Sequence, residues 1–233
     1  MSRRPIIAID GPAGSGKSST ARAVARALGF AHVDSGAVYR AITLISLDDL
    51  GLPPNWTPDA VVAGAKSKPV RVNATAGEFE VWIGGLLAEP AIRADRVTAE
   101  VSRIAAMEPV RAYVNALLKD AARYGGVVMD GRDIGTVVFP DAEVKVFLDA
   151  HPEERARRRL KEKGRETGEH HVQRESQALQ QRDQRDSTRA VAPLARARDA
   201  ILIDTSGLDF EEQVARVVEL VRQLGRKALN TTQ

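Results

Sequence analysis

The chain has 233 residues, enough for one sizeable hydrophobic core or for a core with inserted subdomains. It contains no cysteine, which excludes a disulfide framework and thiolate chemistry, and its formal net charge is only +3. The first apolar run, residues 6–9, is too short for a signal peptide, and no run approaches the ~18 apolar residues that a membrane helix needs. We therefore expect a cytoplasmic protein with no membrane partner.

The first predicted elements are a strand at residues 6–9, a glycine-rich loop and a helix with an apolar stripe over residues 21–28. The loop, residues 11–18, reads GPAGSGKS and fits the phosphate-binding pattern G-x-x-x-x-G-K-[ST] at every fixed position. In this pattern backbone N–H groups surround the phosphates, Lys17 reaches the β- and γ-phosphates, and the Ser18 hydroxyl contacts Mg²⁺. The sequence thus predicts binding of a nucleoside triphosphate with Mg²⁺ through Gly11, Pro12, Ala13, Gly14, Ser15, Gly16, Lys17, Ser18 and Ser19.

Four later segments repeat the form of the first strand, a short apolar or extended run that ends in aspartate. They are residues 30–34, 127–130, 144–149 and 201–204, and helical patterns separate them. This alternation predicts a five-stranded parallel sheet flanked by helices, with the ligand at the carboxyl ends of the strands. Asp130 ends one of these strands and could hold Mg²⁺ directly or through water; the alternative is a carboxylate that only caps the next turn.

The stretch between the second and third strands has a different character. A helix is expected from Ser35 to about Gly51, and the alternating segments 70–74 and 79–83 predict an antiparallel hairpin that turns at Ala76 and Gly77. Residues 35–107 therefore form a predicted inserted subdomain. A helix over residues 109–124 and a final helix over residues 210–227 complete the pattern.

The segment from residue 151 to 198 is rich in arginine and has no strand pattern, which predicts two exposed helices that act as a flap or lid. Two groups of charged residues share a helix face: Arg155, Arg158 and Arg159, and then Arg182, Asp186 and Arg189. They could be solvated helix faces with surface ion pairs, or flap arginines that neutralise a transferring phosphoryl group. No aromatic residue lies between Asp149 and Phe210 to stack on bases, which argues against nucleic-acid binding there.

Several motifs beyond the phosphate-binding loop are distinctive: DSGAVYR at 34–40, IAAMEPVR at 104–111, DGRDIGTVVFPDA at 130–142 and RDQRDSTRAVAPL at 182–194. In this order they resemble the bacterial cytidylate kinases, the CMP kinases of the nucleoside monophosphate kinase group. The resemblance runs from the phosphate-binding loop to the last helix. It implies a P-loop kinase core (residues 1–34, 108–150 and 190–233), a monophosphate-binding subdomain (35–107) and a helical lid (151–189).

The resemblance also implies an activity and a site. The expected reaction transfers the γ-phosphoryl group of ATP to CMP, and also to dCMP, with Mg²⁺, in a monomeric enzyme that binds no nucleic acid. By similarity, cytosine is surrounded by Ser35, Ser102, Arg111 and Asp133; the acceptor phosphate is held by Arg40, Arg132 and Arg189; and Asp186 with Arg182 faces the ribose. The expected metal contacts are Ser18 and Asp130. The expected catalytic groups are Lys17, Arg132, Arg158, Arg182 and Arg189.

These assignments agree with the chemistry of the substrates. Cytosine presents an amino donor with two acceptors, so its pocket needs a carboxylate and a cationic donor, as Asp133 and Arg111 would supply; uracil presents the opposite pattern at positions 3 and 4. The CMP phosphate is itself the nucleophile and is mostly dianionic near neutral pH, so no strong general base is required. Three alternatives stay open: another P-loop small-molecule kinase acting on dephospho-coenzyme A, shikimate or a different monophosphate, an NTP-driven nucleic-acid-binding protein, and a catalytically silent nucleotide-binding module.

Overall fold

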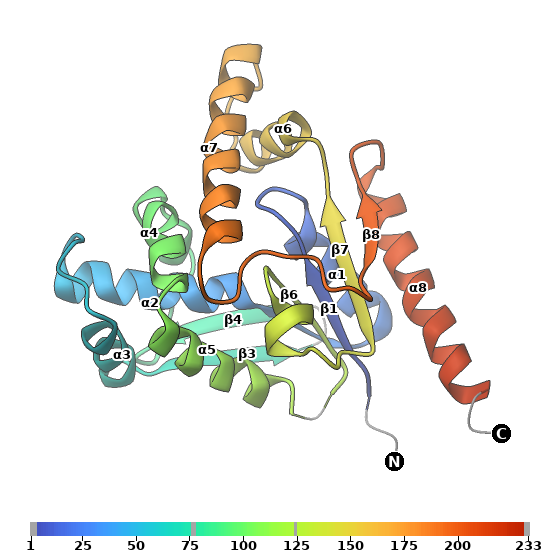
Figure 1. The fold of residues 1–233 in the computed structure, drawn as a ribbon, viewed down its shortest axis with the longest axis horizontal. Helices are drawn as coiled ribbons and strands as arrows, with labels where there is room; N and C mark the ends of the chain where they lie inside the picture. The colour runs from blue at the N-terminus through green and yellow to red at the C-terminus, as the bar shows by residue number, and fades with distance from the viewer. Residues whose placement is uncertain (1–3, 76–77, 124, 231–233) are drawn as a thin grey trace.

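The computed structural model describes residues 4–75, 78–123 and 125–230, and side chains up to residue 223. Its main sheet has five strands in the order β2-β6-β1-β7-β8, and all neighbouring pairs are parallel (Figure 1). The strands are β1 (Ile6–Asp10), β2 (Ala31–Asp34), β6 (Val127–Gly131), β7 (Val144–Asp149) and β8 (Ile201–Asp204). The five-stranded parallel sheet predicted from the aspartate-ended runs is confirmed.

Helices cover both faces of this sheet, so its strands are apolar on both sides. Ile7 and Ile9 point to the face covered by α1 (Lys17–Leu28) and α8 (Phe210–Asn230). Ile6 and Ala8 point to the opposite face, which is covered by α2 (Ser35–Leu50) and α5 (Glu108–Ala121). The strand β1 is fully buried as a result, and the loop that follows it leaves the centre of the sheet.

The predicted inserted subdomain contains the predicted hairpin and elements that the sequence analysis did not anticipate. Strands β3 (Val70–Thr75) and β4 (Glu78–Ile83) pair antiparallel, and the short β5 (Leu86–Leu87) adds a third strand to this sheet. The turn predicted at Ala76 and Gly77 lies outside the described residues. The additional helical elements are α3 (Pro58–Ser67), the 3-10 turn η1 (Ala91–Arg93) and α4 (Asp95–Ala105). Their apolar side chains join the cluster on the α2 face of the main sheet.

The charged segment forms the two predicted helices, α6 (Pro152–Glu162) and α7 (Glu169–Thr188), which lie beyond the carboxyl end of β7 (Figure 1). A short π-helical turn, η2 (Ile134–Val138), connects β6 towards β7. The helix α5 ends at Ala121 rather than at the predicted residue 124, which lies outside the described residues, and α8 runs past the predicted residue 227 to Asn230. Among the described residues, no helix is both long and apolar enough to cross a membrane.

Candidate active site

A cleft of about 600 Å³ lies at the carboxyl ends of the central strands, between the phosphate-binding loop, the inserted subdomain and the lid helices. The phosphate-binding loop lines it with Ala13, Gly14, Gly16, Lys17, Ser18 and Ser19. The side chains predicted to bind the acceptor also all line it, namely Ser35, Arg40, Ser102, Arg111, Arg132, Asp133, Arg182, Asp186 and Arg189. The fold thus brings together residues from five separate stretches of sequence.

Within the phosphate-binding loop, Gly16 is the N-cap of α1, and its φ of 82° is a left-handed conformation that favours glycine. The first N–H groups of α1 therefore face the cleft, where the positive end of the helix dipole attracts an anion. Lys17 is buried, and its ammonium donates to the carbonyl of Pro12 at 3.1 Å. Burial, with the nearby Arg132, lowers the pKa of Lys17 to about 7. Phosphate oxygens would add to the favourable effect that Asp130 and Asp34 already have on this ammonium.

Asp130 lies beside Ser18, as the sequence predicted for a metal-binding pair. The Ser18 hydroxyl donates to Oδ2 of Asp130 at 2.5 Å, and Oδ1 lies 2.9 Å from Nε2 of the buried His32. A hydroxyl and a carboxylate are oxygen ligands of the type that Mg²⁺ prefers. The part of the chain that the structure describes holds no cluster of three or more His, Cys, Asp or Glu that could bind a metal alone.

Three arginines of the cleft lie close enough to disfavour one another's charge. Burial, followed by Arg93, lowers the pKa of Arg40 to about 10, and burial, followed by Arg132 and Arg40, lowers the pKa of Arg182 to about 9. The Nε of Arg182 is buried and has no hydrogen-bond partner among the described residues. Repulsion among neighbouring cations is unfavourable when no ligand is bound, and a bound anion offsets it. Arg40, Arg132 and Arg182 are therefore placed where an anion would be favoured. Arg189, which was expected to hold the acceptor phosphate with Arg40 and Arg132, pairs instead with Asp133.

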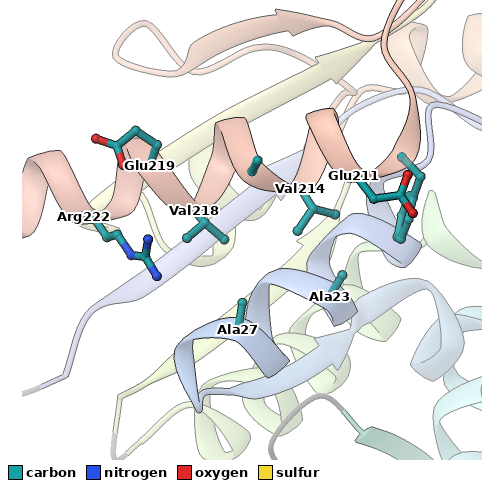
Figure 2. A pocket seen from close by; sticks show the side chains of 9 residues that line it. Ala23, Ala27, Glu211, Val214, Val218, Glu219 and Arg222 are labelled. Carbon is teal, nitrogen blue, oxygen red and sulfur yellow. The ribbon is translucent and has the colours of Figure 1, made fainter.

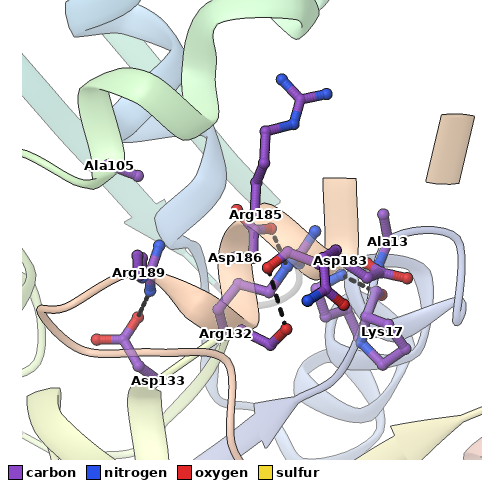
Figure 3. A network of polar contacts seen from close by, with 12 residues as sticks. Ala13, Lys17, Ala105, Arg132, Asp133, Asp183, Arg185, Asp186 and Arg189 are labelled. Atoms are coloured by element: carbon purple, nitrogen blue, oxygen red, sulfur yellow. Dashed lines mark hydrogen bonds and ion pairs between the residues drawn. The ribbon is translucent and has the colours of Figure 1, made fainter. Parts of the chain in front are cut away.

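At the end of the cleft away from the phosphate-binding loop, the carboxylate of Asp133 is paired with two arginines. Asp133 accepts from Arg111 on one oxygen and from Arg189 at 3.2 Å on the other, and all three side chains are at most 5 % exposed. The Arg111 guanidinium also lies 5.5 Å from the ring centroid of Tyr39. Figure 3 shows Asp133 with Arg189 in this polar network and, at a distance from them, Lys17 with Ala13. A carboxylate held beside a cationic donor matches the hydrogen-bond pattern of cytosine.

The loop that carries Asp133 is fixed by the carboxylate at the end of β1. Asp10 accepts from the backbone N–H groups of Ile134 and Gly135, both at 2.8 Å. Burial, which outweighs these two hydrogen bonds, raises the pKa of Asp10 to about 6. The same residue that leads into the phosphate-binding loop thus positions the predicted base-recognition residue.

Asp186 and Ser102 occupy the middle of the cleft. Nε of Arg132 donates to Asp186 at 3.1 Å, and Ser102 is also hydrogen-bonded to Asp186. Burial opposes ionisation of Asp186, but Arg132 and Arg182 outweigh it and hold its pKa below the usual range. The structure therefore contains a carboxylate between the arginine cluster and Asp133, where the sugar of an acceptor nucleotide was expected.

The arginines of α6 that the sequence placed on one helix face have three different environments. Arg155 bonds to the phosphate-binding loop, and Arg159 pairs with Glu175 at 2.8 Å while it lines the cleft. Arg158 donates to the hydroxyl and the carbonyl of Thr205, at 3.0 and 2.6 Å, and is absent from the cleft lining. The guanidinium also lies close to the phosphate-binding loop, because a Cβ atom on Gly16 would be 3.9 Å from Nη1 of Arg158. The catalytic role of Arg158 stays a prediction.

Several other residues of the cleft were not assigned from the sequence, among them Arg93 and Tyr39. Arg93, in the 3-10 turn of the subdomain, pairs with Asp34 at 2.9 Å; burial would raise the pKa of Asp34, but Arg93 holds it below its usual value. The hydroxyl of Tyr39 is buried without a hydrogen-bond partner in the described part of the chain. Tyr39 lies within the DSGAVYR motif, so the motif itself was the available signal. Arg93 has no comparable signal, because only the fold of the insert brings it to Asp34.

A second hollow, of about 570 Å³, lies between α1 and α8 (Figure 2). Its walls are mainly small apolar side chains such as Ala23, Ala27, Val214 and Val218. Glu211, Glu219 and Arg222 lie at its border and do not form a cluster of positive charge. Phosphorylated ligands need such a cluster, so the cleft at the strand ends is the candidate active site.

Comparison with known proteins agrees with this arrangement. A model of the family described as cytidylate kinase matches residues 7–223. The chain belongs to the cytidylate kinase family. A cytidylate kinase of Desulfitobacterium hafniense is 47% identical over 94% of this chain and 94% of its own length. Cytidylate kinases of Chlorobaculum tepidum and Streptococcus pneumoniae are 42% and 43% identical and cover 96% and 91% of this chain.

Membership of the cytidylate kinase family confirms the resemblance inferred from the four motifs. The matched region, residues 7–223, includes every residue predicted for the site and both lid helices. The individual roles assigned to these residues stay predictions. Their common placement around one cleft is the structural basis for the proposals below.

Proposed function

We propose that this protein transfers the γ-phosphoryl group of ATP to CMP, giving CDP and ADP. The observation that carries the proposal is the arrangement of Asp133 and Arg111 at one end of the cleft, with Arg40, Arg132 and Arg182 between that pair and the phosphate-binding loop. An acceptor with a cytosine at one end and a phosphate at the other fits this order of groups. The membership of the cytidylate kinase family supports the same substrate.

The proposed reaction needs positioning and charge neutralisation more than proton transfer. An oxygen of the CMP phosphate attacks the γ-phosphorus of ATP; a new P–O bond forms, and the bond from the γ-phosphorus to the bridging β,γ-oxygen breaks with its electron pair going to ADP. Lys17 and the arginines Arg132 and Arg182 stabilise the charge on the transferring group. Mg²⁺ bound to the nucleotide would supply further charge neutralisation, and Ser18 with Asp130 would hold it.

The base is selected by Asp133. Its carboxylate would accept from the N4 amino group of cytosine, whereas uracil presents a carbonyl oxygen at that position and would leave a buried carboxylate without a donor. In the structure both oxygens of Asp133 already accept from arginines, so a bound cytosine has to share or replace one of these contacts. Arg189 is the easier contact to replace, because its hydrogen bond to Asp133 is long, at 3.2 Å.

Finer features of the proposal follow from the same residues. We propose that dCMP is also a substrate, with Asp186 facing the sugar, and that Mg²⁺ accompanies ATP. We propose the boundaries 35–107 for the acceptor-binding subdomain and 151–189 for the lid, with the rest as the core. A monomeric state and a cytoplasmic location also remain proposals.

The direct test is ADP formation from ATP and Mg²⁺ with CMP, dCMP, UMP, AMP and shikimate offered singly, with the Lys17→Ala variant as the blank. We expect CMP and dCMP to stimulate turnover far above the others. Preference for UMP, AMP or shikimate would identify another small-molecule kinase. RNA binding that weakens steeply with salt would instead indicate a nucleic-acid-binding protein, since phosphate contacts release counterions.

A further inference from the structure

The lid helices contact Ala13 of the phosphate-binding loop through both of its backbone polar groups. Its N–H donates to Oδ1 of Asp183 on α7 at 2.9 Å, and its carbonyl accepts from Nη1 of Arg155 on α6 at 2.9 Å. Ala13 is 1% exposed and belongs to a small apolar cluster that otherwise consists of lid residues, namely Ala156, Leu160, Val172 and Leu179. One residue of the loop is thus held by two helices of the lid.

The two lid side chains that hold Ala13 are also bonded to each other. Nη1 of Arg155 donates to Oδ2 of Asp183, and Nε of Arg155 donates to the carbonyl of Ala150 at 3.0 Å. Both side chains are largely buried, with 6% and 17% exposure. The next residue of the loop, Gly14, permits the close approach, because a Cβ atom there would lie 3.0 Å from the carbonyl oxygen of Arg155. A movement of the lid helices would therefore also move the backbone of residues 13 and 14.

The last turns of α7 also reach the acceptor end of the cleft. Arg182, next to Asp183 in sequence, belongs to the arginine cluster, and Asp186 accepts from Arg132. Ser102 of the subdomain is hydrogen-bonded to Asp186 as well. A single helix end thus contacts the donor-binding loop on one side and the proposed CMP site on the other. Figure 3 shows Asp183 with Ala13 in the same network as Arg132 and Asp186.

We propose that Asp183 and Arg155 are positioning residues that couple the lid to the phosphate-binding loop, so that CMP binding strengthens ATP binding through Ala13. The inference rests on the proposed function, since it takes CMP as the ligand that holds α7 through Arg182 and Asp186. A ligand that stabilises this position of α7 also stabilises the conformation of residues 13 and 14. By linkage, ATP must then strengthen CMP binding by the same factor.

The experiment measures binding of a non-hydrolysable ATP analogue with Mg²⁺ by calorimetry, with and without saturating CMP. For the unaltered protein we expect CMP to tighten binding of the analogue by about 5-fold or more, a typical size for coupled sites. In Asp183→Leu, which removes the acceptor for Ala13 and the partner of Arg155, this factor should fall to near one. Asp183→Asn keeps an acceptor oxygen and should retain an intermediate factor. Glu153→Gln, on the exposed side of α6, is the matched control and should retain the full factor.

Two results would overturn the inference: an unaltered coupling factor in Asp183→Leu, or a factor of one in the unaltered protein. Failure of CMP to bind at all would overturn the proposed function, and with it the inference, so the two failures are distinguishable. A second measurement does not depend on how Asp183→Leu folds. Hydrogen exchange of residues 11–16 in the unaltered protein should slow when CMP alone is added, and unchanged exchange would contradict the coupling.

Discussion

Nε2 of His32 lies 2.9 Å from Oδ1 of Asp130, and both side chains are at most 1% exposed. Because a carboxylate oxygen only accepts, this ring nitrogen carries the proton. The contact joins β2 to β6 and leaves Oδ2 of Asp130 facing the Ser18 hydroxyl. His32 thus fixes the orientation of the carboxylate proposed to hold Mg²⁺.

His32→Phe should destabilise the protein. Phenylalanine approximates the volume of the ring but leaves Oδ1 of Asp130 buried without a donor, which costs about 1–3 kcal/mol. Urea unfolding with an unchanged m-value would measure the loss. His170→Phe is the control, because His170 is exposed and its replacement should leave stability within about 0.5 kcal/mol. Equal stabilities of His32→Phe and the unaltered protein would show that the contact contributes nothing.

Asp133→Asn should relax the choice between CMP and UMP. An amide can present its NH₂ group to a uracil carbonyl, and removal of the carboxylate weakens the contact with the cytosine amino group, so the ratio of kcat/KM for CMP over UMP should fall at least about 100-fold. ATP binding should change little, because Asp133 is at the other end of the cleft. Asp141→Asn, an exposed aspartate of the same loop, should retain the ratio of the unaltered protein. An unchanged ratio in Asp133→Asn would mean that another residue selects the base.

ATP binding should take up a proton through Lys17. The pKa of Lys17 is lowered to about 7 by burial and by Arg132, and bound phosphates must raise it. In the free protein the ammonium form that binds is therefore fully present only well below pH 7, is half lost near pH 7, and disappears as the pH rises further. Affinity for ATP should weaken between pH 7.5 and 9, by at most about tenfold per pH unit. Calorimetry in two buffers of different ionisation enthalpy would count the protons, and Lys17→Arg should show no such uptake.

Arg182→Met should lower activity without lowering stability. The guanidinium lies near Arg132 and Arg40, and its buried Nε has no partner in the described chain, so an apolar side chain of similar length removes an unfavourable charge. We expect kcat to fall more than about 10-fold, because a contact to the transferring group is lost. The melting temperature should stay the same or rise. Arg185→Met, its exposed neighbour on α7, should change neither quantity, and a large loss of stability in Arg182→Met would contradict the description of this site.

Local patterns were sufficient for the central sheet and for the phosphate-binding loop. The strand, loop and helix at residues 6–28 depend on contacts between near neighbours, and the aspartate-ended apolar runs marked every strand of the main sheet. The helix α4 was not anticipated, although Val97, Val101 and Ile104 form an apolar stripe on it; the short α3 also begins at a recognisable N-cap, Thr57, with Pro58 in the first turn. Both helices lie in the inserted subdomain, where the alternating pattern of the hairpin was the stronger local signal.

Family motifs predicted the acceptor-site residues, but only the tertiary structure determined their partners. The spacing of Arg155, Arg158 and Arg159 placed them on one face of a helix. Helical spacing gives the direction in which a side chain leaves the helix, but not which other elements it reaches. Packing of α6 between the phosphate-binding loop, the loop after β8 and α7 then gave each arginine a different partner. The contacts of Asp183 with Ala13 and of His32 with Asp130 join residues that are 170 and 98 positions apart. Such pairs follow from the arrangement of the strands and helices in space, which no local pattern in the sequence contains.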